Sequence, residues 1–129
     1  MTNVRVMLLA LMAALFLSAC SELKLKTNVP QPSNKQLASG IKSYEDGDYQ
    51  TALFTLNKAQ EMGLHEKRDQ VLAHKYLAFI HCVSGREKLC REEFREAFEV
   101  DPTFELTPAE AGHPVWGPVF RNERAKNAK

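Results

Sequence analysis

Two cysteines in the second half of the chain have the spacing for a disulfide within a helical hairpin. Cys82 lies three residues before Gly85 and Cys90 five residues after it, near the end of one predicted helix and the start of the next. An antiparallel hairpin would place the two opposite each other, and a disulfide requires Cα atoms about 4.4 to 6.8 Å apart. We therefore expect a Cys82–Cys90 disulfide. In the alternative, Cys90 only fills a small-residue position of a helix contact and Cys82 is a buried thiol.

The same cysteines could carry redox or metal chemistry, but their spacing disfavours both. A thioredoxin-type dithiol has the pattern Cys-x-x-Cys within a strand and helix unit, which is not the arrangement of Cys82 and Cys90. His74 and His81 add zinc ligand types without the spacing of a zinc site. We expect no metal and no cofactor, and we interpret both histidines as partly exposed polar residues.

The sequence contains no other catalytic signature. Acidic pairs such as Glu92-Glu93 and Glu45-Asp46 belong to charged helical faces. The remaining residues do not assemble into a Ser-His-Asp triad, a phosphate-binding glycine loop or a nucleophile turn. We therefore expect a protein that is not an enzyme and has no small-molecule substrate.

The third cysteine, Cys20, follows a segment typical of a bacterial export signal. The only charged residue of this segment is Arg5, residues 6–17 are apolar, and two small residues precede the cysteine. The apolar run is too short to cross about 30 Å of hydrocarbon as a stable helix. We predict that residues 1–19 are a signal peptide that is removed.

Residues 17–20, Leu-Ser-Ala-Cys, resemble the lipobox of bacterial lipoproteins. The resemblance implies that the Cys20 thiol is diacylated and that the new amino terminus is acylated after cleavage. Several acyl chains hold a protein on a membrane durably, where a single chain does not. In that family an Asp after the cysteine commonly implies inner-membrane retention, whereas this chain has Ser21. We expect a lipid anchor in the outer membrane, on the oxidising periplasmic side, where disulfides persist.

Without its first nineteen residues the chain is formally neutral. The whole sequence has 17 Lys and Arg against 16 Asp and Glu, and the predicted signal contains one Arg and no acid. A nucleic-acid-binding protein would carry a basic excess, so we expect no nucleic-acid partner. Residues 20–33 contain Pro30 and Pro32 and have no partner strand, so we interpret them as a flexible linker.

From Asn34 onward the apolar residues follow a helical period, and the pattern occurs twice. Gly47 and Gly85 each separate two helices. Aligning these glycines pairs small residues with small and large with large: Gly40 with Ala78, Ala52 with Cys90, Leu56 with Phe94 and Ala59 with Ala97. Two helices approach to about 8 Å only where one presents a small side chain, so we expect Gly40 to face Ala52. The sequence predicts an all-α fold with two helical hairpins, over residues 34–64 and 71–102.

These hairpins resemble tetratricopeptide repeats, which are helix–turn–helix units of about 34 residues. The resemblance rests on the small residues, the glycine turns and Asp101-Pro102 at the end of the second unit. In that family the first helix of each unit lines a concave surface, which implies a partner-binding groove formed by Leu37, Ile41, Tyr44, Leu72, Lys75 and Phe79. Such a surface suits an amphipathic helix or an extended apolar peptide, unless the protein's own tail occupies it.

Residues 103–129 are expected to form a loop and a capping helix over the second hairpin. Residues 107–110, Thr-Pro-Ala-Glu, have the N-cap, proline and acid of a helix start. Pro114 can begin a last helix whose inward residues would be Trp116, Val119 and Phe120, with Arg121, Glu123, Arg124 and Lys126 facing water. A small domain usually buries its only Trp, which favours a cap; the apolar stripe could instead dock a partner helix.

The lipobox, the linker, the two hairpins and the ending Pro-Ala-Glu-Ala-Gly-His-Pro-Val-Trp-Gly-Pro-Val-Phe together resemble the TssQ-type lipoproteins associated with type VI secretion. The resemblance covers nearly the whole chain. It implies an accessory scaffold at the outer membrane that binds protein partners of an envelope secretion complex. Two other hypotheses stay open: a pilotin or assembly factor of a type IV pilus or barrel-assembly complex, and a periplasmic thiol oxidoreductase, which the cysteine spacing disfavours.

Overall fold

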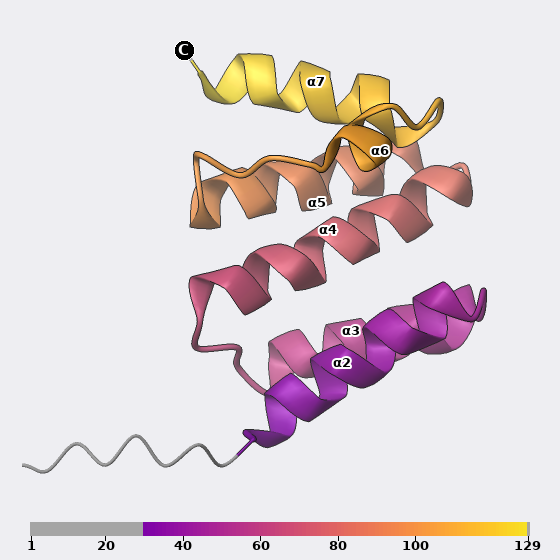
Figure 1. Ribbon diagram of the computed structural model, residues 1–129, viewed down its shortest axis with the longest axis vertical. Helices are drawn as coiled ribbons and strands as arrows, with labels where there is room; N and C mark the ends of the chain where they lie inside the picture. Colours follow the sequence, from indigo (N-terminus) through magenta and orange to yellow (C-terminus); the bar gives the residue numbers. More distant parts are fainter. Residues whose placement is uncertain (1–29, 129) are drawn as a thin grey trace, which may run out of the picture.

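The computed structural model describes residues 30–128, and every regular element in that range is an α-helix (Figure 1). The helices are α2 (Pro32–Glu45), α3 (Tyr49–Glu61), α4 (Lys67–Val83), α5 (Glu87–Val100), α6 (Pro108–Ala111) and α7 (Trp116–Asn127). The predicted all-α fold of two helical hairpins and a C-terminal helix is confirmed. None of these helices is long and apolar enough to cross a membrane. The predicted signal peptide, Cys20 and the linker up to residue 29 lie outside the described residues.

Each hairpin turns at a glycine with a positive φ angle. Gly47 between α2 and α3 has φ +80° and Gly85 between α4 and α5 has φ +72°, a left-handed conformation that side chains with a Cβ atom rarely adopt. Asp48 then begins α3 as its N-cap, because its side chain accepts a hydrogen bond of 3.1 Å from the backbone N–H of Thr51.

The helices of the first hairpin approach closely at Gly40, as the sequence predicted, but the residue opposite Gly40 differs from the predicted one. A Cβ atom added to Gly40 of α2 would lie 2.8 Å from the side chain of Leu56 on α3. Leu56, rather than Ala52, is therefore the residue for which Gly40 makes room. Close approach of the two helices buries Ala52, Leu56 and Ala59 completely.

Two apolar clusters form the core, and α4 contributes to both. The first lies between the first hairpin and α4, and its buried members are Leu37, Ala52, Leu56, Ala59, Leu64, Ala73, Leu77 and Ile80. The second lies between α4, α5 and the C-terminal segment, and its buried members are Ala78, Phe79, Cys82, Cys90, Phe94, Phe98, Leu106, Trp116 and Phe120. Helix α4 is therefore covered on most of its circumference, with α2 and α3 on one side and α5 and α7 on the other (Figure 1).

Three helix starts differ from the sequence prediction. Helix α2 begins at Pro32 instead of Asn34, since proline is well suited to the first helical position. Helix α4 begins at Lys67 instead of residue 71, and the side chain of Gln70 in its first turn donates a hydrogen bond of 2.6 Å to the carbonyl of Leu64. The last helix begins at Trp116 instead of Pro114.

The start of α7 is delayed by the ring of His113. Its Nδ1 accepts a hydrogen bond of 3.2 Å from the backbone N–H of Val115, and this holds Pro114 and Val115 in a turn. The short helix α6 has the expected capping box, in which Thr107 and Glu110 each accept a hydrogen bond from the other's backbone N–H.

Helix α7 covers α5 with the apolar residues expected at this contact. Trp116 and Phe120 are buried, and Val119 packs against the same cluster. The prediction that Glu123 faces water is wrong, because the residue is only 6% exposed. Its carboxylate is covered by the ammonium group of Lys126 at 2.6 Å, and the pair lies beside a hollow between the C-terminal ends of α5 and α7.

Candidate functional site

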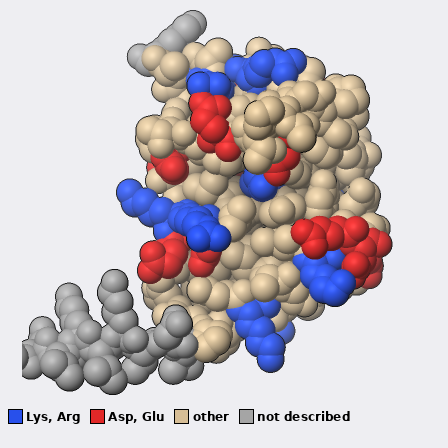
Figure 2. All heavy atoms as spheres, in the orientation of Figure 1, with Lys and Arg blue, Asp and Glu red and all other residues tan. Residues whose placement is uncertain are grey.

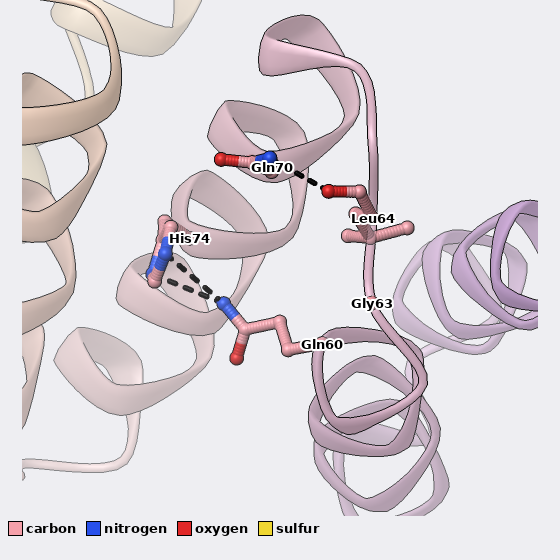
Figure 3. A pocket seen from close by; sticks show the side chains of 5 residues that line it. All are labelled: Gln60, Gly63, Leu64, Gln70 and His74. Atoms are coloured by element: carbon pink, nitrogen blue, oxygen red, sulfur yellow. Dashed lines mark hydrogen bonds between the residues drawn. The ribbon is translucent and has the colours of Figure 1, made fainter.

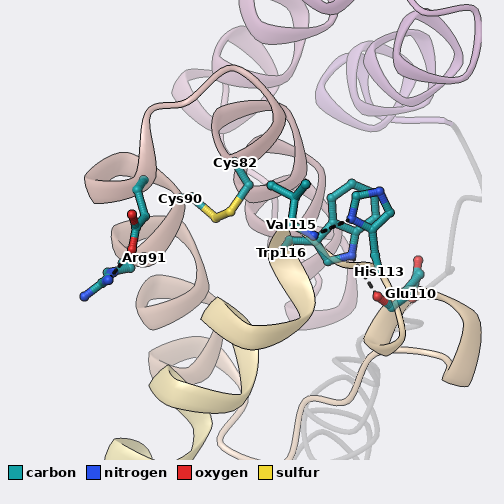
Figure 4. The surroundings of a disulfide bond; sticks show 8 residues. Cys82, Cys90, Arg91, Glu110, His113, Val115 and Trp116 are labelled. Carbon is teal, nitrogen blue, oxygen red and sulfur yellow. Dashed lines mark hydrogen bonds and ion pairs between the residues drawn. A yellow bond between two sulfur atoms is a disulfide. The ribbon is translucent and has the colours of Figure 1, made fainter.

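The predicted disulfide between Cys82 and Cys90 is present in the structure. It joins the end of α4 to the start of α5, with Cα atoms 5.1 Å apart (Figure 4). Both cysteines are buried in the second apolar cluster. Cys90 also occupies the position that Ala52 has in the first hairpin, so the bond stabilises a contact that is already close.

The candidate zinc ligands are not brought together. His74 Nδ1 lies 2.7 Å from a carboxylate oxygen of Glu93 and Gln60 Nε2 lies within 3.2 Å of the same ring. The side-chain Nδ1 of His81 is buried without a hydrogen-bond partner, and burial, followed by the nearby Arg86, lowers the pKa of His81. Within residues 30–128 no three His, Cys, Asp or Glu side chains converge as metal ligands.

A pocket lies where α3 passes into α4. Its lining residues are Gln60, Gly63, Leu64, Gln70 and His74 (Figure 3). The side chain of Gln60 reaches across to His74, and Gln70 turns away toward the Leu64 carbonyl (Figure 3). The side chains of Gln60, His74 and Glu93 form one hydrogen-bonded chain from α3 through α4 to α5. The pocket is therefore best explained as part of the contact between the two hairpins.

Three of the six predicted groove residues are not available to a partner. Leu37 is 4% exposed and belongs to the first apolar cluster, while Phe79 is 1% exposed and belongs to the second. Lys75 is 9% exposed. The prediction that these three line an open groove is therefore wrong.

The protein's own C-terminal segment covers Phe79. The indole of Trp116 stacks on the Phe79 ring with centroids 4.2 Å apart, and the ring of His113 stacks on Trp116 with centroids 3.3 Å apart. Trp116 Nε1 donates a hydrogen bond of 2.8 Å to the carbonyl of Glu110, which fixes the indole (Figure 4). Around Phe79, therefore, the protein's own tail covers the position that was predicted to face a partner.

The same segment neutralises Lys75. Its ammonium group lies 2.6 Å from a carboxylate oxygen of Glu110 and 4.6 Å from the centre of the Tyr76 ring. Burial raises the pKa of Glu110, but hydrogen bonds from Lys75 and from the Thr107 backbone outweigh this effect and lower it overall. Lys75 is therefore a structural link between α4 and α6 and not a free cation.

A half-buried apolar strip remains open between α2 and α4. It consists of Ile41, Tyr44, Leu72 and Tyr76, which pack against the first cluster from its edge, and we call it the groove face. Three of its members were predicted. Tyr76 was missed as a groove residue, although its spacing of four from Leu72 places both on one side of α4.

The two tyrosines of the groove face contact each other edge to face. Their ring centroids are 5.0 Å apart, and Tyr49 from the start of α3 lies 5.6 Å from Tyr44. Burial, followed by the neighbouring tyrosines and Glu110, raises the pKa of Tyr44 to about 12. Half-exposed tyrosines offer a large rigid contact area at a low entropic cost, so this part of the strip is suited to binding a protein.

The groove face continues at Leu72 into a pocket of about 320 Å³ beside the loop between α5 and α6. Val71, Leu72 and Phe104 give it an apolar wall. Its acidic groups are satisfied within the protein, for example Asp101 by Thr103 and Glu110 by Lys75. The pocket thus lengthens the apolar surface without adding a reactive group.

Comparison of the chain with protein-family models, with curated proteins and with solved structures finds no match.

Proposed function

We propose that this protein is an outer-membrane lipoprotein that acts as a protein-binding scaffold, accessory to a type VI secretion system, and that it is not an enzyme. The observation that carries the binding role is the groove face, where Ile41, Tyr44, Leu72 and Tyr76 stay half exposed where the two hairpins pack together. An apolar strip of this kind on helical hairpins suits a partner helix or an extended apolar segment.

The membrane part of the proposal rests on the sequence around Cys20. Leu-Ser-Ala-Cys at residues 17–20 supplies a thiol for lipid attachment, and Ser21 favours sorting to the outer membrane. The assignment to type VI secretion rests on the resemblance of the whole chain, above all of its tail, to the TssQ-type lipoproteins.

The burial of the disulfide supports a scaffold over a thiol oxidoreductase. Exchange begins when a thiolate attacks one of the two sulfur atoms, so a catalytic disulfide must be accessible. Cys82 and Cys90 are both in the core, beneath the chain around Val115 and Trp116 (Figure 4).

The anchor is tested by fractionating cells that produce the wild type or single variants. We expect Cys20→Ala to leave the outer-membrane fraction and to impair type VI secretion, because no acyl chain can be attached. Ser21→Asp is expected to move the protein to the inner membrane, and Ser21→Ala is the matched control that stays in the outer membrane. Unchanged fractionation of Cys20→Ala would contradict the lipid anchor.

The partner is tested by affinity purification of the wild-type protein from membranes. Recovery of type VI components, reduced by a substitution in the groove face such as Leu72→Ala, is the expected result. Recovery of pilus or barrel-assembly subunits without type VI components would instead favour a pilotin or assembly factor.

A further inference from the structure

The chemistry of the partner can be inferred from the surroundings of the groove face, provided that the protein-binding role proposed above holds. Helices α2, α3, α5 and α7 cover most of α4, and one of its partly exposed stripes contributes Leu72 and Tyr76 to the groove face. Asp69, Leu72, Tyr76 and Val83 share that stripe by their spacing of three, four and seven, and all four are at least partly exposed.

The two ends of the groove face differ in charge. Helices α2 and α4 run in the same direction, so both C-terminal ends lie at one edge of the face, beside the N-terminal ends of their hairpin partners α3 and α5 (Figure 1). The opposed helix dipoles largely cancel there, so side chains set the charge of this edge. Glu45, Asp46 and Asp48 are exposed at the end of α2 and just beyond it. Figure 2 shows acidic atoms gathered at its right, together with basic ones.

One of these three carboxylates forms an ion pair. Lys42 pairs with Asp46 at 2.9 Å, whereas Glu45 is exposed and forms no ion pair within residues 30–128. The charge of Arg86, in the turn of the second hairpin, lowers the pKa of His81. His81 lies on the side of α4 opposite to Leu72 and Tyr76, so Arg86 is near that other side.

The opposite end of the face is mixed in charge. Lys67 and Arg68 lie exposed in the first turn of α4, and Glu66 and Asp69 are beside them. Blue and red atoms accordingly alternate at the left of Figure 2. A partner is therefore steered in one orientation, with its positive charges toward the end of α2.

The aromatic rings lie at the acidic end. Tyr44 is next to Glu45 in the sequence and contacts both Tyr49 and Tyr76. Ring faces attract ammonium and guanidinium groups, and Arg stacks on Tyr particularly well. The same end thus offers carboxylates and aromatic surface to one kind of side chain.

We propose that the groove face receives an amphipathic segment of a partner protein whose apolar side covers Leu72 and Tyr76 and whose arginine or lysine residues lie over Tyr44 and Glu45. The contact combines apolar burial along α4 with charge complementarity at the end of α2. Its affinity falls with ionic strength, because the carboxylates at that end are exposed and screened by salt.

The test uses the full chain, extracted in a neutral detergent, and two synthetic helical peptides of the same length as α4, 17 residues. Both peptides carry the same stripe of leucines; one has lysines beside it and the other glutamates. Binding is measured by isothermal titration calorimetry at two salt concentrations, with protein-free micelles as the blank. The basic peptide is expected to bind more tightly, and the difference is expected to shrink at high salt.

Variants locate the binding site. Glu45→Lys is expected to weaken binding of the basic peptide about fivefold, and Leu72→Ala to weaken it as well. Glu96→Lys on the exposed side of α5 is the matched control and should leave binding unchanged. Circular dichroism checks that each variant keeps its helices.

Equal or tighter binding of the acidic peptide would overturn the proposal, and so would equal effects of Glu45→Lys and Glu96→Lys. A third contrary result would come from sedimentation: the chain alone is a dimer, and the peptide does no more than separate the two copies. These outcomes are independent of the cellular role. If Cys20→Ala changes neither localisation nor secretion but the basic peptide binds at Glu45, the proposed cellular function fails while the binding chemistry stands.

Discussion

The indole of Trp116 stacks on the ring of Phe79 with centroids 4.2 Å apart and planes inclined by 19°. This contact joins the C-terminal segment to the middle of α4 and converts what would be an open groove residue into a core residue. Trp116 is the only tryptophan of the chain, and its burial shows that the tail completes the second hairpin.

Replacing Trp116 by Ala should destabilise the protein by about 3–5 kcal/mol, since it removes a large buried ring and leaves a cavity against Phe79. Urea unfolding followed by circular dichroism measures the change. Phe54→Ala is the control, because Phe54 is 68% exposed and its loss should cost about 0.5 kcal/mol or less. Similar losses in both variants would mean that the tail does not hold the second hairpin.

Removing the disulfide should lower stability without changing the fold. The bond closes a short loop, and the chain-entropy model gives about 2.5 kcal/mol for a loop of this size. In a double variant, Cys82→Ala with Cys90→Ala, alanine at position 90 repeats the arrangement seen at Ala52, so helix content should be kept. Loss of helical circular dichroism, or a midpoint in urea equal to that of the oxidised wild type, would contradict this.

The pair of Lys75 and Glu110 should make stability depend on pH in the acid range. The pKa of the Glu110 carboxyl is lower in the folded state than its ordinary value of 4.5, so its contribution is present above that pH and is lost as the pH falls through the folded-state pKa. We expect the free energy of unfolding of the wild type to exceed that of Glu110→Gln by about 1–2 kcal/mol near pH 7 and by much less near pH 3. A gap that stays constant across this range would show that the ion pair contributes nothing.

Gly40→Ala should destabilise the first hairpin although alanine favours helices. The new Cβ atom would lie 2.8 Å from Leu56, which is fully buried and cannot move freely. Overpacking of this kind costs about 1–3 kcal/mol, against about 1 kcal/mol gained in helix propensity. Ser39→Ala, on the exposed side of α2, serves as the control in thermal unfolding. A stabilised Gly40→Ala would mean that the two helices are not in close contact.

The hairpins and the disulfide could be predicted from the sequence because their signals are local. Gly47 and Gly85 occupy turns with positive φ angles, and the helical period of the apolar residues extends from one turn to the next. Once two antiparallel helices are joined at Gly85, the positions of Cys82 and Cys90 follow from the geometry of the hairpin.

The composition of the groove could not be predicted in the same way, because it depends on contacts between distant parts of the chain. Lys75 and Glu110 are 35 residues apart, and no periodic pattern links them. Phe79 has the same helical spacing whether a partner or Trp116 covers it. The resemblance to an open repeat groove therefore assigned to a partner two residues, Lys75 and Phe79, that the tail already contacts.

The most direct test of the account is photo-crosslinking in intact cells, with a photoreactive amino acid at Tyr44 in one strain and at the exposed Phe54 in another. Position 44 lies in the groove face, whereas position 54 points to solvent on α3. We predict a crosslink from position 44 to a protein of the type VI envelope complex and none from position 54. Equal crosslinks from both positions, or no protein crosslink from position 44, would contradict the account.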